Sequence, residues 1–290
     1  RETAALCDPP VPPRRAGRTR WEPWSVISAP LTDALPPTHW LGNGRYGVAL
    51  RSNGAGLSQW RSHGLTRWRD DALRDDRGSF VYVQRGPGAP RVSVTAHPAA
   101  DPRARYTCRM LPDRVVYEAR WRDLTVRTTV WVSPEDDCEL RQVELEYSGS
   151  DTLALTLSLA LEPTLSPQRA DESHPAFANL FMQAYWHEGD QALYLRRKPR
   201  LGTERELRAV LGLAHSDGTV LAVQPCADRL RWWGRYGSAA RPVGDGATVW
   251  LPDEAVATDV AKDVTHAHEG AEASPPDAAA TAATDALPMP

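Results

Sequence analysis

Lysine is almost missing from this chain of 290 residues. All but two of its 34 cationic side chains are arginine, the exceptions being Lys198 and Lys262, and the formal net charge is −3. A total so close to neutral gives no support to binding of nucleic acid or of an anionic membrane. No run approaches the ~18 apolar residues of a membrane span, and the first residues lack the charged-then-apolar order of a secretory signal. The chain is therefore expected to be soluble.

Cysteine and patterned histidine are scarce as well. The four cysteines, Cys7, Cys108, Cys138 and Cys226, are far apart and form no C-x-x-C pair. This spacing indicates neither a zinc site nor a redox dithiol. The histidines show no acid/base motif, and only His266 and His268, near the C-terminal end, could bind a metal weakly. We expect no cofactor and no metal.

The two ends of the chain differ in composition from the residues between them, because they are rich in proline and, at the C-terminal end, in alanine. Residues 1–36 are rich in proline and arginine, with a basic cluster at Arg14, Arg15, Arg18 and Arg20, and are interpreted as a linker. Residues 253–290 are acidic, rich in alanine and proline, and free of aromatic side chains. Such a composition buries too little apolar surface to offset chain entropy, so this tail is predicted to be disordered. A folded domain is expected over residues 37–252.

Within that domain the hydrophobic period is two, and helical periodicity is hard to find. Five leucines at every second position from Leu153 to Leu161 place all of them on one face of a strand, which predicts a buried sheet. Similar alternation runs through 115–121, 124–132 and 143–147. Further strands are expected at 46–52, 79–85, 90–96, 106–111, 180–187, 190–197, 206–215, 219–224 and 247–251. The sequence therefore predicts an all-β fold, a large antiparallel β-sandwich.

The stretch from residue 41 to residue 80 is unusually dense in glycine, tryptophan, arginine and aspartate. It contains Leu41-Gly42-Asn43-Gly44-Arg45-Tyr46, a glycine turn at 53–56, and Thr66-Arg67-Trp68-Arg69-Asp70-Asp71. Later pieces are Ser133-Pro134-Glu135-Asp136-Asp137, His174-Pro175-Ala176-Phe177 and Asp228-Arg229. The glycines precede no strand-to-helix G-x-G-x-x-G and no P-loop lysine, so a nucleotide site is not indicated. Positive backbone dihedrals in tight turns explain them.

In these motifs and their order, the chain resembles the N-terminal sandwich domain of glycoside hydrolase family 94, formerly glycosyltransferase family 36. The most similar members are cyclic β-1,2-glucan synthases and enzymes like cellobiose phosphorylase. The resemblance covers residues 38 to 236 and implies a supersandwich of the galactose-mutarotase-like type. It departs from the family pattern at Leu57, Gln59 and Arg77, where an aromatic, an arginine and a tryptophan are usual.

The resemblance also implies a setting for the domain. In that family the general acid lies in an (α/α)₆ barrel that follows the sandwich, and no such helical region follows residue 250 here. The chain is thus expected to be a piece of a glucan synthase or phosphorylase, inactive alone. Its expected partners are a β-glucan or gluco-oligosaccharide, the barrel of the parent protein, and a second copy in a homodimer. Its expected location is cytoplasmic, or at the inner membrane through other parts of the parent.

Catalysis by adjacent carboxylates is the alternative that the residues themselves raise. Glycosidases place two carboxyl groups ~5 to ~9.5 Å apart, whereas neighbours on a strand point to opposite faces. The pairs Asp70/Asp71, Asp75/Asp76 and Asp136/Asp137 are explained better as turn formers and partners of arginines. We therefore assign no catalytic residue.

Sugar binding fits the residues better than catalysis does. Tryptophan offers an apolar face to the C–H side of a sugar, and planar charged groups suit paired hydroxyls. The predicted sugar-binding residues are Trp60, Arg67, Trp68, Arg69 and Asp76. An accessory carbohydrate-binding sandwich is the leading hypothesis. A free-standing sugar enzyme of the epimerase type and a non-sugar interaction module remain as alternatives.

Overall fold

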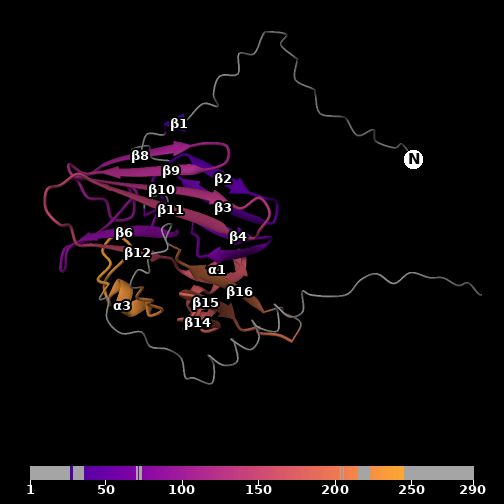
Figure 1. Ribbon diagram of the computed structural model, residues 1–290. Coiled ribbons are helices and arrows are strands. Elements are labelled where there is room, and N and C mark those ends of the chain that lie inside the picture. Colours follow the sequence, from indigo (N-terminus) through magenta and orange to yellow (C-terminus); the bar gives the residue numbers. More distant parts are fainter. Residues whose placement is uncertain are drawn as a thin grey trace, which may run out of the picture.

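The computed structural model describes residues 27–28, 36–69, 71, 74–202, 204, 206–214 and 223–244. Within these residues the chain forms sixteen strands and three short helices (Figure 1). Every strand pairing is antiparallel. The predicted all-β antiparallel sandwich is therefore confirmed. Of the predicted linker, only residues 27–28, which form a short strand, and residue 36 are described, and the whole predicted tail lies outside the described residues.

The first layer of the sandwich is a single five-stranded sheet, which we call sheet A. Its order is β1 (Ile27–Ser28), β8 (Arg105–Met110), β9 (Val115–Arg120), β10 (Leu124–Val132) and β11 (Glu139–Tyr147). The alternation along β10 has its expected result, because Leu124, Val126, Thr128 and Val130 are buried while Thr125, Arg127 and Thr129 are half-buried. The strand thus presents one apolar face to the core.

Two sheets form the facing layer. Sheet B has the order β13 (Pro163–Pro167), β5 (His63–Thr66), β4 (Gly56–Trp60), β3 (Tyr46–Arg51) and β2 (Thr38–Gly42). Sheet C has the order β12 (Leu155–Ala160), β6 (Phe80–Arg85) and β7 (Arg91–Ser93). Sheet A buries residues against both of them. One core cluster joins Val48 and Leu50 of sheet B to Val115 and Tyr117, and another joins Val83 of sheet C to Val126.

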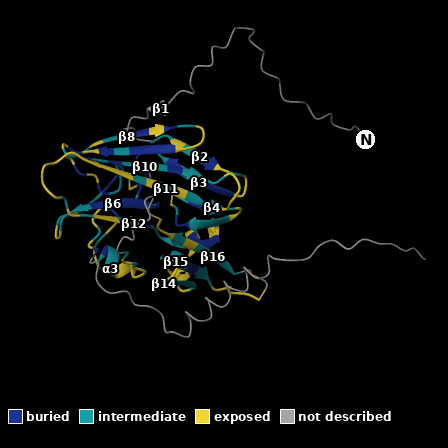
Figure 2. Ribbon diagram, in the orientation of Figure 1, coloured by how far each residue is buried: buried dark blue, intermediate teal, exposed yellow. Residues whose placement is uncertain are grey.

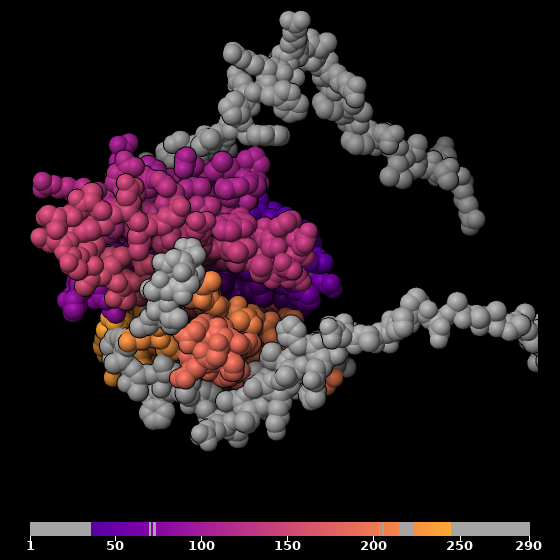
Figure 3. All heavy atoms as spheres, in the orientation of Figure 1, coloured from indigo at the N-terminus to yellow at the C-terminus, as the bar shows by residue number. Residues whose placement is uncertain are grey.

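The remaining elements lie on the side of this layer away from sheet A (Figures 1 and 3). Sheet D has the order β14 (Met182–His187), β15 (Ala192–Arg197) and β16 (Leu207–Gly212). The helices are α1 (Gln168–Ser173), α2 (Pro175–Asn179) and α3 (Arg229–Trp233). Helix α3 places Trp233 against Tyr82, whose hydroxyl donates a 2.8 Å hydrogen bond to the carbonyl of Ala239. Trp233 and Ala239 thereby cover part of the outer face of sheet C.

The leucine stripe is the main correction to the sequence prediction. It forms β12, but Leu157 is 39 % exposed and Leu159 is 38 % exposed, so the expected fully buried face is wrong there. The reason is position, because β12 is the edge strand of sheet C. The edge strand β11 of sheet A leaves Leu145 and Tyr147 exposed as well. Exposed stretches of β11 and β12 are coloured yellow in Figure 2. One flank of the sandwich is therefore open and apolar.

Several short elements were not predicted from the sequence. The missed strands are β1, which lies in the predicted linker, and β2, β4, β5 and β13, and the missed helices are α1, α2 and α3. Of the strand predicted at 219–224, only residues 223–224 are described, and they are not in a strand; the one at 247–251 lies outside the described residues. In the described part of the chain, no helix is both long enough and apolar enough to cross a membrane.

Candidate functional site

Asn43 connects two of the sequence motifs that lie ninety residues apart. Its side-chain amide nitrogen donates to the carbonyls of Ser133 and Asp136, both at 2.9 Å. Its side-chain oxygen accepts hydrogen bonds from the backbone nitrogens of Arg45 at 3.0 Å and Tyr46 at 2.9 Å. One carboxamide therefore shapes the β2–β3 turn and ties it to the β10–β11 loop. The Asn-Gly-Arg-Tyr motif has a structural role.

Trp60 takes part in the same junction. Its indole nitrogen donates a 2.5 Å hydrogen bond to Asp137, which also accepts from Arg45 at 2.8 Å. The hydrogen bond from Trp60, followed by the bond and charge of Arg45, holds the pKa of Asp137 below its ordinary value. The Arg61 guanidinium lies 4.7 Å from the centre of the Trp60 ring. The indole edge and one ring face of Trp60 are thus already occupied by protein groups.

Arg67 is a buried hub and is only 6 % exposed. All three of its guanidinium nitrogens donate hydrogen bonds: Nε and Nη2 to Asp171 at 2.9 and 2.8 Å, and Nη1 to Glu162 at 3.0 Å. Nη2 also reaches the Pro175 carbonyl at 3.1 Å and the Asn179 side chain at 2.7 Å. These bonds fasten α1 and α2 to the end of β5. Arg67 has little capacity left for a sugar hydroxyl.

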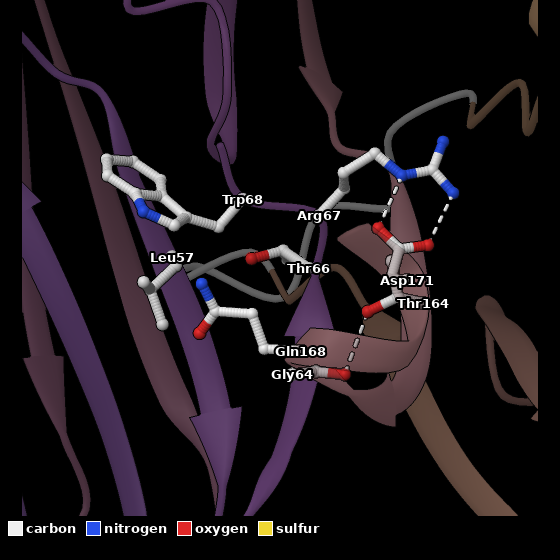
Figure 4. A pocket seen from close by; sticks show the side chains of 8 residues that line it. All are labelled: Leu57, Gly64, Thr66, Arg67, Trp68, Thr164, Gln168 and Asp171. Carbon is white, nitrogen blue, oxygen red and sulfur yellow. Dashed lines mark hydrogen bonds and ion pairs between the residues drawn. The ribbon is translucent and has the colours of Figure 1, made fainter. Parts of the chain in front are cut away.

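Trp68 lies on the opposite side of the chain from Arg67, on the outer face of sheet B (Figure 4). The Arg51 guanidinium stacks 4.9 Å from its ring centre. Arg51 is fixed in turn by an ion pair with Asp75, which is buried and also accepts a 2.6 Å hydrogen bond from Asn53. Trp68 itself is half-buried, so part of its ring is accessible.

A small depression brings Trp68 and Arg67 together with residues of α1. It is lined by Leu57, Gly64, Thr66, Arg67, Trp68, Thr164, Gln168 and Asp171 (Figure 4). Its enclosed space is about 10 Å³, close to that of one water molecule. A glucose ring does not fit inside it. Any sugar would lie on the open face beside the depression.

The other predicted site residues do not line this depression. Arg69 is exposed, and Asp76 is half-buried with its carboxylate 3.4 Å from Nε of Arg77. The five predicted residues therefore fall into separate groups, and sugar binding by them stays a prediction. Arginine–aspartate ion pairs are present, as expected, and they join Arg51 to Asp75, Arg67 to Asp171 and Arg45 to Asp137.

Adjacent aspartates behave as the structural interpretation expects. Asp75 is buried against Arg51 and Asn53, whereas Asp76 pairs with Arg77. Their carboxylates serve different arginines and do not flank a common space. Across the described residues, no three side chains of histidine, cysteine, aspartate or glutamate gather as metal ligands.

Two further motifs also have structural roles. Asp228 caps α3, because its Oδ1 accepts from the backbone nitrogens of Leu230 at 2.7 Å and Arg231 at 3.2 Å. Phe177, in α2, packs edge-to-face on Phe181 with ring centres 5.2 Å apart. Arg200 stacks on Phe177 at 4.8 Å. Asp228 thus stabilises the helix that packs on sheet C, whereas Phe177 and Arg200 stabilise the region next to α1, which contacts β13 of sheet B.

Sequence reasoning missed Trp40, which is 52 % exposed on β2. It also missed Arg51, Glu162 and Asp171, which hold the predicted residues in place. Trp40 could have been found from Gly42 and Gly47, since a pair of glycines two residues along a hairpin from a tryptophan leaves room for its ring. The acidic partners of Arg67 lie about a hundred residues away and give no local signal.

The comparisons agree with the motifs. The family described as glycosyl hydrolase 94, supersandwich domain, matches residues 24–251 of this chain. Cyclic β-(1,2)-glucan synthase NdvB of Rhizobium meliloti (strain 1021) is 27 % identical over 195 residues. The matched region is 67 % of this chain and 7 % of that protein, so the chain spans only a small part of its relative. The resemblance inferred from the motifs is confirmed.

Proposed function

Because the chain belongs to the glycosyl hydrolase 94 supersandwich family, we propose that it is a carbohydrate-binding accessory domain working beside a catalytic domain. The observation that carries this proposal is Trp68, a partly accessible indole on the outer face of sheet B with Arg51 stacked on it. An apolar ring beside a fixed guanidinium suits a sugar, which has an apolar C–H face and hydroxyls at its rim.

The chemical class of the ligand follows from the relative. Its name specifies a cyclic β-(1,2)-glucan. We take a linear β-1,2-linked gluco-oligosaccharide as the ligand to test first. The shallow site fits this choice, since the depression beside Trp68 encloses too little space for a whole sugar ring and favours binding along a surface.

The open flank between β11 and β12 supports the second half of the proposal. Leu145, Tyr147, Leu157 and Leu159 are each between 38 % and 47 % exposed along two edge strands. Exposed apolar patches of this kind commonly mark contacts with another domain. In this proposal the flank packs against the helical barrel that carries the chemistry in the family. A change of two flank leucines to serine should then weaken domain contact without affecting glucan binding.

Isothermal titration calorimetry on the 290-residue chain tests the binding half. Linear β-1,2-gluco-oligosaccharide should give binding heat with the native chain, and Trp68→Ala should weaken the affinity severalfold. Tyr236→Ala is the matched control, because Tyr236 is 92 % exposed on a different part of the fold. An absence of heat from the folded native chain would exclude glucan binding and leave the interaction module as the better interpretation.

A further inference from the structure

Trp40 occupies the edge strand of sheet B on the face turned away from the core. It pairs in register with Ala49 of β3, which pairs with Leu57 of β4. The residues that alternate with these, among them Leu41, Val48 and Leu50, belong to the buried core. Trp40 therefore projects from the outer face, where it is 52 % exposed.

Glycine holds the Trp40 ring flat against the sheet. A Cβ atom added to Gly47 would lie 2.1 Å from Cζ2, 2.7 Å from Cη2 and 2.9 Å from Cε2 of Trp40. All three atoms belong to the six-membered ring, so this ring rests directly on the backbone of Gly47. A Cβ on Gly42 would lie 3.1 Å from the indole nitrogen. One face of the indole is thus seated on the sheet, and the other is presented outward.

The same sheet face carries Trp68. Leu57 lines the depression with Trp68, and it lies two strands from Trp40 in the same row, or roughly 10 Å at the usual strand spacing. Arg51 and Gln59 lie on this face in the neighbouring rows, on β3 and β4. The face therefore has an indole near each end, with Ala49, Leu57 and polar side chains between them.

We propose that Trp40 and Trp68 together form a platform on the outer face of sheet B that binds a linear β-glucan by stacking. This inference rests on the proposed function and adds Trp40, seated on Gly47, as its second aromatic contact. Gly42, Gly47 and Ala49 leave the backbone close to the surface, so an extended chain of sugars can lie along the sheet. The side-chain amide of Gln59 supplies a donor and an acceptor for hydroxyl groups at its side.

A protein partner is the competing occupant of this face, and its composition argues against one. Protein contacts are enriched in large apolar anchors at their centre. The described part of this chain has such anchors on the flank of β11 and β12, where Leu145, Leu157 and Leu159 are exposed. Around Trp40 the neighbours are instead glycine and alanine. An isolated flat ring among small and polar groups suits a sugar better than a protein surface.

Calorimetry with linear β-1,2-gluco-oligosaccharide on the 290-residue chain tests the platform. Trp40→Ala should weaken the affinity by about tenfold, the upper end for one aromatic stacking contact, and Trp40→Phe should retain most of it. Gly47→Ala keeps the tryptophan but lifts its ring from the sheet, and should also weaken binding. Gly212→Ala is the matched control, because its new methyl group would meet only Cβ of Ala192 at 4.0 Å.

The outcomes separate this inference from the proposed function. If the native chain binds and both Trp40→Ala and Gly47→Ala bind equally well, the platform is overturned while glucan binding through Trp68 stands. If the folded native chain gives no heat, both proposals fail. If Trp40→Ala lowers the thermal stability of the domain, the glucan affinities of Trp40→Phe and Gly47→Ala decide whether the platform binds glucan. A loss of self-association in sedimentation with unchanged glucan affinity would assign the face to protein contact.

Discussion

Replacing Arg67 with methionine should destabilise the domain strongly. Methionine preserves most of the length of the side chain but removes the guanidinium, which is buried and bonds to four residues. These bonds join the end of β5 to α1 and α2, so their loss acts on the contact between sheet B and the region that covers it. The change tests whether this part of the Thr-Arg-Trp-Arg motif serves stability.

The size of the effect follows from what Arg67 leaves behind. Glu162 keeps two cationic partners, Arg77 at 2.9 Å and Arg229 at 3.3 Å, and stays compensated. Asp171 has a side chain only 6 % exposed and loses the guanidinium that binds both of its oxygens. Removing one member of a buried ion pair typically costs ~3–5 kcal/mol. We expect a loss in this range, mostly from Asp171.

Urea unfolding monitored by circular dichroism measures this loss as a change in the free energy of unfolding. The double variant Arg67→Met, Asp171→Leu should recover part of it, because no buried carboxylate is then left without a partner. Arg109→Met, an exposed arginine on β8, is the control and should change stability by less than about 0.5 kcal/mol. The reasoning is refuted if Arg67→Met costs less than about 1 kcal/mol, or if the double variant is no more stable than the single one.

Two further substitutions test other contacts. Asp101 accepts hydrogen bonds from the Arg103 side chain and, at 2.9 Å, from the Trp121 indole. These bonds, mainly the one from Arg103, lower the pKa of Asp101 from 3.8 to about 2. Because the pKa is lower in the folded chain, ionised Asp101 stabilises the fold at every pH above its pKa in the unfolded chain. This stabilisation is lost as the pH falls through about 2. Asp101→Asn should therefore cost about 1–2 kcal/mol at pH 7, after allowance for the exposed Arg103, and urea midpoints of variant and native chain should converge towards pH 2. Asn43→Ala should cost about 1–2 kcal/mol through loss of the bonds to Ser133 and Asp136. Asn43→Asp keeps the acceptor for Arg45 and Tyr46 but loses both donors and places a carboxylate oxygen beside two carbonyls, so it should lower the urea midpoint as well. Equal urea midpoints for all three chains would contradict the junction.

The sandwich could be predicted because its long strands carry the information locally. Residues 124–132 alternate so regularly that both the strand and its buried face follow from the sequence, and β10 has the predicted bounds. The short strands β4 and β5 failed this test. Strand β4 contains Gly56 and is five residues long, and β5 contains Gly64 and is four residues long. Their alternation is therefore too brief to identify a strand, and a glycine in so short a segment is easily interpreted as part of a turn.

Edge position is another property that alternation cannot convey. Leu157 and Val126 sit in equally clear patterns, yet Leu157 is 39 % exposed and Val126 is fully buried. The difference is that β10 has a neighbour on both sides, whereas β12 is the last strand of its sheet. Neighbours along a sheet are set by chain topology over long sequence distances. A leucine stripe therefore predicts which face of a strand is apolar. How deeply that face is buried depends on the neighbouring strands, which the stripe does not predict.

The candidate site was harder to predict for a related reason. Arginine and aspartate are dense in residues 41–80, and this density suggested a binding surface. In the structure, many of these charges are used within the protein, as when Arg67 binds Asp171 and Arg45 binds Asp137. A polar group already bonded to the protein gains little by binding a ligand instead. The recognition surface is then better sought where an aromatic face is positioned but not used by the protein, and Trp40 on Gly47 meets that condition more fully than the half-buried Trp60.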